Sequence, residues 1–281
     1  MTARVRAFEY IRRMRGGSQA KLLRCSDGGY YVVKFQNNPQ GVRILANELL
    51  ATLLAKKLGL PVSEPAIVEV HPRLVKYAAG LVIEERNGRT PCRSGLCFGS
   101  RYAGDRGTAC RLQLVHDLLP ESLARVENIS DFAGMLAFDK WTGNKDDRQV
   151  VFTPEEDGTP CRSYRARMID QGHCFNASLW NFPDNPRYGV YSRRAVYASI
   201  SGMNAFERWL CPLEHEIDRS VLDGAAQEIP PEWYEYDRGS LSQLVATLDD
   251  RRNQVRDFLQ TMRRTVDGVF PAWALSNAVA A

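Results

Sequence analysis

Short apolar runs separated by turn-forming residues dominate the first hundred positions, a pattern typical of β-strands. Two of these runs, 20–25 and 30–35, flank Ser26-Asp27-Gly28-Gly29. Glycine accepts the positive φ angles of tight turns, so this arrangement predicts a β-hairpin. Three further runs are expected to form strands: 66–70, 80–84 and 95–102.

One segment of this part has the periodicity of a helix. Between Val42 and Leu58 apolar residues recur every three or four positions, and Gly59 follows the last of them. The spacing predicts a helix over 42–58 that stops at the glycine. Glu48 lies beside the apolar stripe, so its side chain is expected to face the sheet rather than bulk water.

Beyond residue 100 helical patterns prevail. Ser130 is a candidate N-cap for a helix that ends near Trp141. Two strand-like runs follow, 149–153 and 163–169, on either side of a turn at 154–160. The region is therefore expected to contain a helix followed by a hairpin.

The remainder of the chain contains one irregular and one regular segment. Residues 175–191 combine aromatic side chains with two prolines, which predicts an ordered irregular loop. The apolar spacing over 240–266 predicts one long amphipathic helix or a broken pair. The expected fold class is α+β: a two-lobed fold with a strand-rich N-lobe over 1–100, a helix-rich C-lobe over 101–281, and a cleft between them.

The composition suits two ordinary globular lobes. Of the 281 residues, 44% are apolar and 25% are charged, which argues against fibrous and disordered chains. No apolar run approaches the roughly 20 residues needed to cross a bilayer. The residues up to Arg15 lack the apolar core of a signal peptide, and Glu9 argues against a transit peptide. A cytoplasmic protein is expected.

Charge and cysteine content argue against a nucleic-acid-binding protein and a zinc protein. The net charge is +4, from 37 basic and 33 acidic residues, and the basic clusters lack interleaved aromatic residues. A solvated surface explains such clusters better than a nucleic-acid interface, and a phosphate-rich ligand stays compatible with them. The seven cysteines are scattered and form no zinc-binding pattern.

Four ionisable residues stand out by their positions. Asp146 and Asp170 each follow an apolar run and are 24 positions apart, and Lys34 lies inside a β-branched and aromatic run. Kinase folds use this kind of spacing between the catalytic loop and the metal-binding aspartate. Lys34 and Glu48 are so placed that they can pair over the phosphates of a nucleotide.

These residue types suit phosphoryl transfer, which needs neutralised phosphates and a positioned nucleophile more than covalent chemistry. Lys34 provides a fixed cation. Asp170 offers hard oxygen ligands for Mg²⁺. Asp146, rather than Asp147, is expected to orient the attacking hydroxyl group or accept its proton.

Two amides near these carboxylates are further candidates. Asn144 is assigned to the catalytic residues and Gln149 to the metal ligands, because each offers a neutral oxygen that can bind a second metal or fix the loop. Taken singly, every one of these residues is more often a solvated surface residue. Their joint order and spacing nevertheless favour a nucleotide site.

Backbone groups complete the predicted nucleotide site. Gly16, Gly17 and Ser18 precede the first strand of the hairpin, and their exposed NH groups can approach a phosphate. Phe98 and Ser100 lie in the last predicted strand of the N-lobe, at a connector whose backbone is a candidate contact for the adenine edge. Flexible surface turns with two glycines are commoner, so the first of these signals is weak by itself.

The combination resembles the HipA-like kinases, in particular their smaller branch without the extra N-terminal domain. The resemblance covers about 15–176 and rests on the motifs YYVVKF, ILANELLATLLAKKLGLPV, WTGNKDDRQVVF and MIDQGH. It implies a two-lobed protein-kinase-like fold that uses ATP and Mg²⁺. The roles it implies are Lys34 as the phosphate lysine, Glu48 as its helix partner, Asp146 as the catalytic aspartate and Asp170 as the magnesium aspartate.

One departure from the family separates two functions. The family usually has an asparagine about five residues after its catalytic aspartate, and Val151 occupies that position here. If Gln149 replaces the missing amide, the chain is an ATP-dependent kinase for a protein Ser or Thr or a small hydroxyl compound. Otherwise it is a pseudokinase, a nucleotide-binding or interaction module without turnover. A structural protein without a nucleotide site is a distant third alternative.

Overall fold

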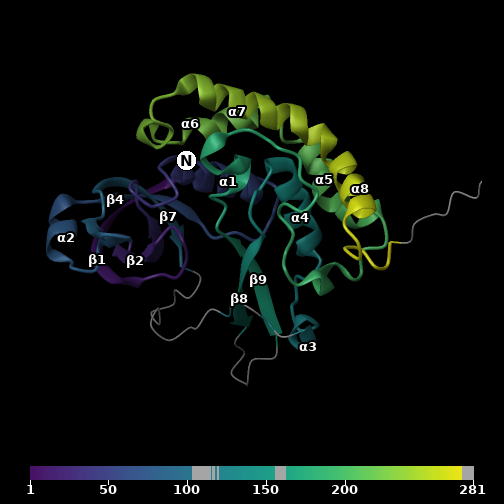
Figure 1. Ribbon diagram of the computed structural model, residues 1–281, viewed down its shortest axis with the longest axis horizontal. Coiled ribbons are helices and arrows are strands. Elements are labelled where there is room, and N and C mark those ends of the chain that lie inside the picture. The colour runs from purple at the N-terminus through teal and green to yellow at the C-terminus, as the bar shows by residue number, and fades with distance from the viewer. Residues whose placement is uncertain (103–114, 116–117, 119, 156–162, 274–281) are drawn as a thin grey trace, which may run out of the picture.

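Five strands of the N-terminal part close into a barrel in the order β1-β2-β3-β7-β4 (Figure 1). They are β1 (Ala3–Arg13), β2 (Lys21–Cys25), β3 (Tyr30–Lys34), β4 (Pro65–Val70) and β7 (Gly95–Arg101). The structure, a computed structural model, describes residues 1–102, 115, 118, 120–155 and 163–273. The predicted hairpin and the strands at 66–70 and 95–102 are confirmed.

Strand β1 closes the barrel and was not predicted from the sequence pattern. Its first half pairs with β4 in parallel, and its second half pairs with β2 antiparallel. Only Val5 and Ala7 of this strand are buried, because arginines occupy many of its other positions. The period of two is therefore too weak to recognise without the tertiary structure.

A small hairpin and a short helix flank the barrel. Strands β5 (Val82–Glu85) and β6 (Gly88–Pro91) form a separate antiparallel hairpin, and α2 (Pro72–Tyr77) follows β4. Only β5 was predicted. Helix α2 buries no residue and every residue of β6 is exposed, so neither has an apolar pattern to detect.

Helix α1 (Arg43–Lys57) joins the barrel to the helical part of the molecule. Eleven of its 15 residues are buried. It contacts β4 and β7 of the barrel, and it also contacts helices that follow the hairpin far along the chain. One apolar cluster accordingly extends from Ile67 and Phe98 through the leucines of α1 to Trp141.

The C-terminal part is helical around one hairpin. Helix α4 (Asp131–Thr142) leads into β8 (Gln149–Glu155) and β9 (Ser163–Ile169), which confirms the predicted order. The other α-helices are α3 (Pro120–Leu123), α5 (Glu207–His215), α6 (Arg219–Gln227), α7 (Arg238–Arg251) and α8 (Val255–Thr265). Figure 1 shows α6, α7 and α8 along one outer edge, with α1 and α4 beneath them.

The irregular segments also follow the sequence pattern. Residues 175–191 contain no α-helix or strand, and the 3-10 helix η1 (Cys174–Leu179) includes left-handed residues. The segment 240–266 is a broken pair, because η5 (Arg252–Gln254) separates α7 from α8. The other 3-10 helices are η2 (Arg194–Tyr197), η3 (Met203–Phe206) and η4 (Pro231–Tyr234).

Three details complete the comparison with the sequence. Ser130 precedes α4, but its side chain makes no capping hydrogen bond. Most of the turn predicted at 154–160 lies outside the described residues. Within the described ranges, every helix is too short or too polar to cross a membrane.

Candidate active site

A buried lysine connects the barrel to both of its predicted partners. Lys34 ends β3, and its ammonium group donates to the Glu48 carboxylate and to Asp170 Oδ1, the latter at 2.6 Å. Burial by itself would lower the pKa of Lys34, but the charges of Asp170 and Glu48 outweigh it and raise that pKa. Lys34 is therefore a fixed cation at neutral pH.

Glu48 is held by groups from the barrel and from the chain that follows β9. Its oxygens accept hydrogen bonds from the backbone NH groups of Gln171 at 3.2 Å and Gly172 at 3.0 Å, in addition to the Lys34 ammonium. Burial raises the pKa of Glu48, while Lys34 opposes that rise. Because both oxygens accept from backbone donors, the ionised carboxylate is the form that fits these contacts.

Asp170 follows β9 directly, and its backbone is left-handed with φ 58°. Burial by itself would raise the pKa of Asp170, but the ammonium of Lys34 outweighs it and lowers the pKa to about 2. The side chain is 24% exposed. An ionised carboxylate that still reaches solvent is a suitable ligand for a hard cation such as Mg²⁺.

A buried ion pair fixes the loop that precedes β8. Helix α4 ends at Gly143 with φ 59°, and Arg148 then donates to both carboxylate oxygens of Asp139 on α4. Both side chains are fully buried. Arg148 also donates to the carbonyl of Ile169 at 2.9 Å. The pair thus ties the loop to α4 and to the end of β9, immediately before Asp170.

The catalytic candidates are neighbours within this loop. Asn144 is buried; its amide donates to Asp139 at 3.0 Å, and its oxygen accepts from the Asp146 NH at 3.2 Å. Both ends of this amide are thus engaged inside the loop, so Asn144 is placed to position Asp146. Asp146 is half-buried and Asp147 is exposed, with the Asp147 NH 2.9 Å from Asp146 Oδ1.

Gln149, the amide predicted to bind a metal, lies next to Asp146. Gln149 is exposed, and its amide nitrogen is 3.4 Å from Asp146 Oδ2. Val151 is 2% exposed and lies opposite Arg167 in the hairpin. The position that usually carries an asparagine in HipA-like kinases is therefore apolar core in this chain, and metal binding by Gln149 stays a prediction.

Comparison with known proteins identifies the family. The sequence matches the family model of HipA-like kinases over residues 7–160, more than half of the chain. The chain belongs to this family. The matched range contains Lys34, Glu48 and Asp146 and ends before Asp170. A search of curated proteins finds no significant match.

Solved structures place this HipA-like kinase among protein-kinase folds. It is similar to the Helicobacter pylori proinflammatory kinase CtkA, with 14% identity and a TM-score of 0.57, over 95% of this chain and 100% of that one. It also matches the Golgi casein kinase with Mn/ADP bound, with 10% identity and a TM-score of 0.48, over 94% of this chain and 74% of that one. The likeness to CtkA confirms the expected two-lobed α+β fold.

The barrel face that bears Lys34 includes both of the predicted adenine contacts. Directly opposed residues of paired strands share a face of the sheet. Phe98 lies opposite Lys34, and Ser100 lies opposite Val32. Phe98 is buried and Ser100 is half-buried, so Ser100 is the more accessible of the two.

An apolar cluster on the same face was not predicted. Leu22 lies opposite Val32 and clusters with Tyr102, the residue after β7. Four partly buried apolar residues pack against them: Ile11, Met14, Tyr30 and Val32. Because side chains alternate along a strand, the sequence alone could have placed Val32 on the same face as Lys34. The places of Leu22 and Tyr102 on this face could be found only from the pairing of the strands.

The glycine turn between β1 and β2 is anchored to β5. Gly16 has φ +116°, and Gln19 exchanges two hydrogen bonds with the backbone of Glu84, at 2.7 and 2.8 Å. A Cβ atom on Gly17 would lie 3.3 Å from the Gln40 side-chain amide. Ser18 is buried. Gln40 therefore lies directly beside this turn, and phosphate binding by Gly16, Gly17 and Ser18 stays a prediction.

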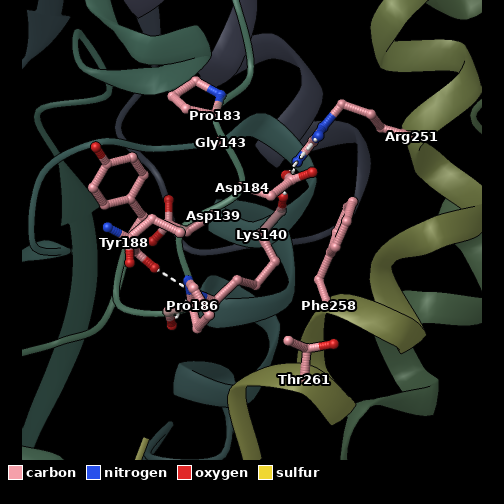
Figure 2. A pocket seen from close by; sticks show the side chains of 11 residues that line it. Asp139, Lys140, Gly143, Pro183, Asp184, Pro186, Tyr188, Arg251, Phe258 and Thr261 are labelled. Carbon is pink, nitrogen blue, oxygen red and sulfur yellow. Dashed lines mark hydrogen bonds and ion pairs between the residues drawn. The ribbon is translucent and has the colours of Figure 1, made fainter. Parts of the chain in front are cut away.

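Two charged side chains near the end of α4 hold the irregular segment in position (Figure 2). Lys140 donates to the carbonyls of Pro186 and Tyr188, at 2.7 and 2.5 Å, and Arg251 donates to Asp184 at 2.9 Å. Burial lowers the pKa of Lys140 to about 8. The cavity between these groups measures about 60 Å³, which is room for roughly two water molecules rather than a nucleotide.

Proposed function

We propose that this protein transfers the γ-phosphoryl group of ATP to a hydroxyl group of a protein Ser or Thr or of a small molecule, with Mg²⁺ as the cofactor. The observation that supports the proposal most strongly is the placement of Lys34 between Glu48 and Asp170. These three residues come from β3, α1 and the end of β9. Their convergence is what the nucleotide site of a kinase requires.

Each residue has a distinct task in this proposal. Lys34 neutralises phosphate oxygens and is kept in place by Glu48, and Asp170 is the carboxylate that would hold Mg²⁺. A Mg²⁺ ion held by Asp170 would supply positive charge beside the phosphates of the nucleotide. The site fits the ion because Asp170 is ionised at neutral pH and still partly exposed.

Asp146 is the proposed orienting residue for the acceptor hydroxyl. Asn144 and the Asp139–Arg148 pair fix the loop that carries it. A group that orients a hydroxyl must come within about 3 Å of it or reach it through one water. Asp146 precedes β8 and Asp170 follows β9, and the two strands pair at this end through Gln149 and Ile169, which supports a shared role at one site.

A pseudokinase is the second candidate, favoured by the burial of Val151. Without a neutral oxygen at that position, a site for a second metal is incomplete unless another side chain replaces it. Such a protein would still bind the nucleotide, but it would not turn it over.

Incubation with Mg²⁺ and ATP labelled at the γ-phosphate distinguishes the two functions. We expect label on the protein itself or on an offered hydroxyl acceptor, with ADP release, and loss of both in Asp170→Asn and Asp146→Asn. Asp147→Asn should retain transfer. ATP binding without ADP release would instead establish the pseudokinase, and absence of ATP binding would contradict both candidates.

A further inference from the structure

His173 lies beside the proposed catalytic carboxylate, and no role above has used it. It follows Gly172, and its Nδ1 atom is 4.0 Å from Asp146 Oδ2. Its backbone carbonyl accepts a hydrogen bond from the NH of Lys145 at 3.1 Å. The backbone of His173 is thus tied to the loop that carries Asp146, and Nδ1 of its ring faces the Asp146 carboxylate.

The far side of the imidazole is held by Gln40. The Gln40 side-chain nitrogen is 3.0 Å from His173 Nε2. Gln40 sits in a loop that Asn38 organises, because the Asn38 amide donates to the carbonyls of Phe35 and Gly41, both at 2.9 Å, and accepts from the NH of Gln40. The loop therefore presents the Gln40 side chain in one defined place, next to the glycine turn.

These contacts select one tautomer of the histidine. In the orientation that the structure gives the Gln40 amide, its nitrogen faces His173 Nε2 and donates to it, so a neutral ring carries its proton on Nδ1. That proton is directed to the side of Asp146. Among the described residues, the Gln40 oxygen is buried without a hydrogen-bond partner. A buried polar group without a partner calls for an explanation, and a role at a functional site is one.

We propose that Gln40 and His173 are positioning residues that set the orientation of the Asp146 carboxylate. The inference rests on the proposed function, in which Asp146 orients the acceptor hydroxyl. Asp146 Oδ1 accepts the NH of Asp147 at 2.9 Å, whereas Oδ2 has only a longer contact, 3.4 Å from the Gln149 amide nitrogen, and is the oxygen that we assign to the hydroxyl. A distance of 4.0 Å exceeds a direct hydrogen bond; the Nδ1–H dipole therefore attracts Oδ2 electrostatically and limits the rotation of the carboxylate.

The first test uses the two amide substitutions of His173. An asparagine amide nitrogen replaces Nδ1 and a glutamine amide nitrogen replaces Nε2. We expect His173→Ala and His173→Gln to lower kcat by about 10- to 100-fold, the range that misplacement of a catalytic group produces, with an unchanged KM for ATP. His173→Asn should retain most of the turnover. The exposed His215 provides the control, since His215→Ala should match the parent.

Two results of that experiment would overturn the inference. One is a kcat for His173→Ala equal to that of the parent. The other is equal turnover of the glutamine and asparagine variants, which would show that a donor at the Nδ1 position has no special effect.

The second test does not depend on turnover. Nitrogen NMR of the imidazole ring at alkaline pH, assigned with His173→Asn, should show the Nδ1-protonated tautomer in the parent and a mixture in Gln40→Leu. An Nε2-protonated ring in the parent would overturn the inference. A parent that has the expected tautomer but transfers no phosphate to any acceptor would overturn the proposed function instead.

Discussion

At the scale of single residues, the site depends on charges that are buried together. Lys34 is 8% exposed in its side chain, and Glu48 is 3% exposed. Removing water from charges is costly, so such a group stabilises the fold only while its partners remain. Lys34 is therefore expected to contribute to stability in addition to its proposed role in phosphate binding, and the two effects can be measured separately.

Replacement of Lys34 by alanine should weaken both properties. It leaves the carboxylates of Glu48 and Asp170 without their shared cation, which we expect to lower the free energy of unfolding by about 3 kcal/mol. ATP affinity should also fall. Urea unfolding and calorimetric titration with ATP measure the two effects, and the exposed Lys57 supplies the control Lys57→Ala, which should change neither. Unchanged ATP affinity in Lys34→Ala would remove the lysine from the phosphate site.

The depressed pKa of Asp170 predicts a specific dependence of stability on pH. A carboxylate whose pKa falls on folding stabilises the protein above its ordinary value of 3.8, and this stability is lost as the pH decreases towards about 2. The parent should therefore exceed Asp170→Asn in free energy of unfolding by about 2 kcal/mol at pH 6. Urea unfolding at a series of pH values should show this difference shrinking below pH 4; a constant difference would argue against the ion pair.

At the scale of elements, short segments lock the helices to the loops of the site. On α1, the Asn47 amide lies within hydrogen-bond distance of the carbonyls of Gly172, Cys174 and Ala177, and its oxygen accepts from the Trp180 indole at 2.7 Å. The helix that provides Glu48 thereby also holds the chain after Asp170. On the other side, Gly189 donates to the carbonyl of Asp146 at 3.1 Å.

The packing of Gly189 on α4 gives an element-scale prediction with a matched control. A Cβ atom on Gly189 would lie 2.2 Å from Asp139 Cβ, whereas one on Gly268 would meet nothing within 4 Å; their φ angles are +70° and +65°. Gly268→Ala should lower the free energy of unfolding by about 1 kcal/mol, because alanine is strained in the left-handed backbone conformation. Gly189→Ala should cost clearly more and also reduce turnover, because it displaces Asp139 and the catalytic loop. Equal losses in urea unfolding would show that the segment can move away from α4 freely.

At the scale of the whole molecule, the two lobes share one core through α1. Its buried leucines pack in the cluster that includes both barrel and C-terminal residues, while a second cluster fills the barrel alone. An element so embedded in both lobes should couple their unfolding. The hydrogen bonds of Lys34 and Asn47 also join the N-terminal lobe to the C-terminal lobe, and so they add to this coupling.

A cavity in α1 should therefore destabilise the molecule as one unit. Leu50 is 1% exposed, and Leu50→Ala is expected to lower the free energy of unfolding by about 2 to 5 kcal/mol. Calorimetry should show one transition at a lower temperature, with equal calorimetric and van't Hoff enthalpies. Separate transitions for the barrel and the helical part would contradict the coupling.

Local patterns were sufficient for several central elements and for the residues that meet at Lys34. Hydrophobic periodicity and turn residues are encoded within a few positions, so the hairpin, α1, β8 and β9 were predicted close to their observed bounds. Lys34, Glu48 and Asp170 were recognisable because their spacing, and the motifs around them, are those of a known family. The same local patterns did not predict β1, whose alternation is weak, or α2 and β6, which bury no residue.

Only the tertiary structure decided which polar groups are buried and what they contact. In the sequence, Asp139 and Arg148 look like ordinary charged residues, but both side chains are fully buried in the structure. The position of Asp139 within the apolar run of α4 was a sequence feature that could have predicted a buried carboxylate. The contact of Gln40 with His173 joins positions 133 residues apart. Such contacts leave no local period in the sequence, because they depend on how α1, the glycine turn and the hairpin pack together.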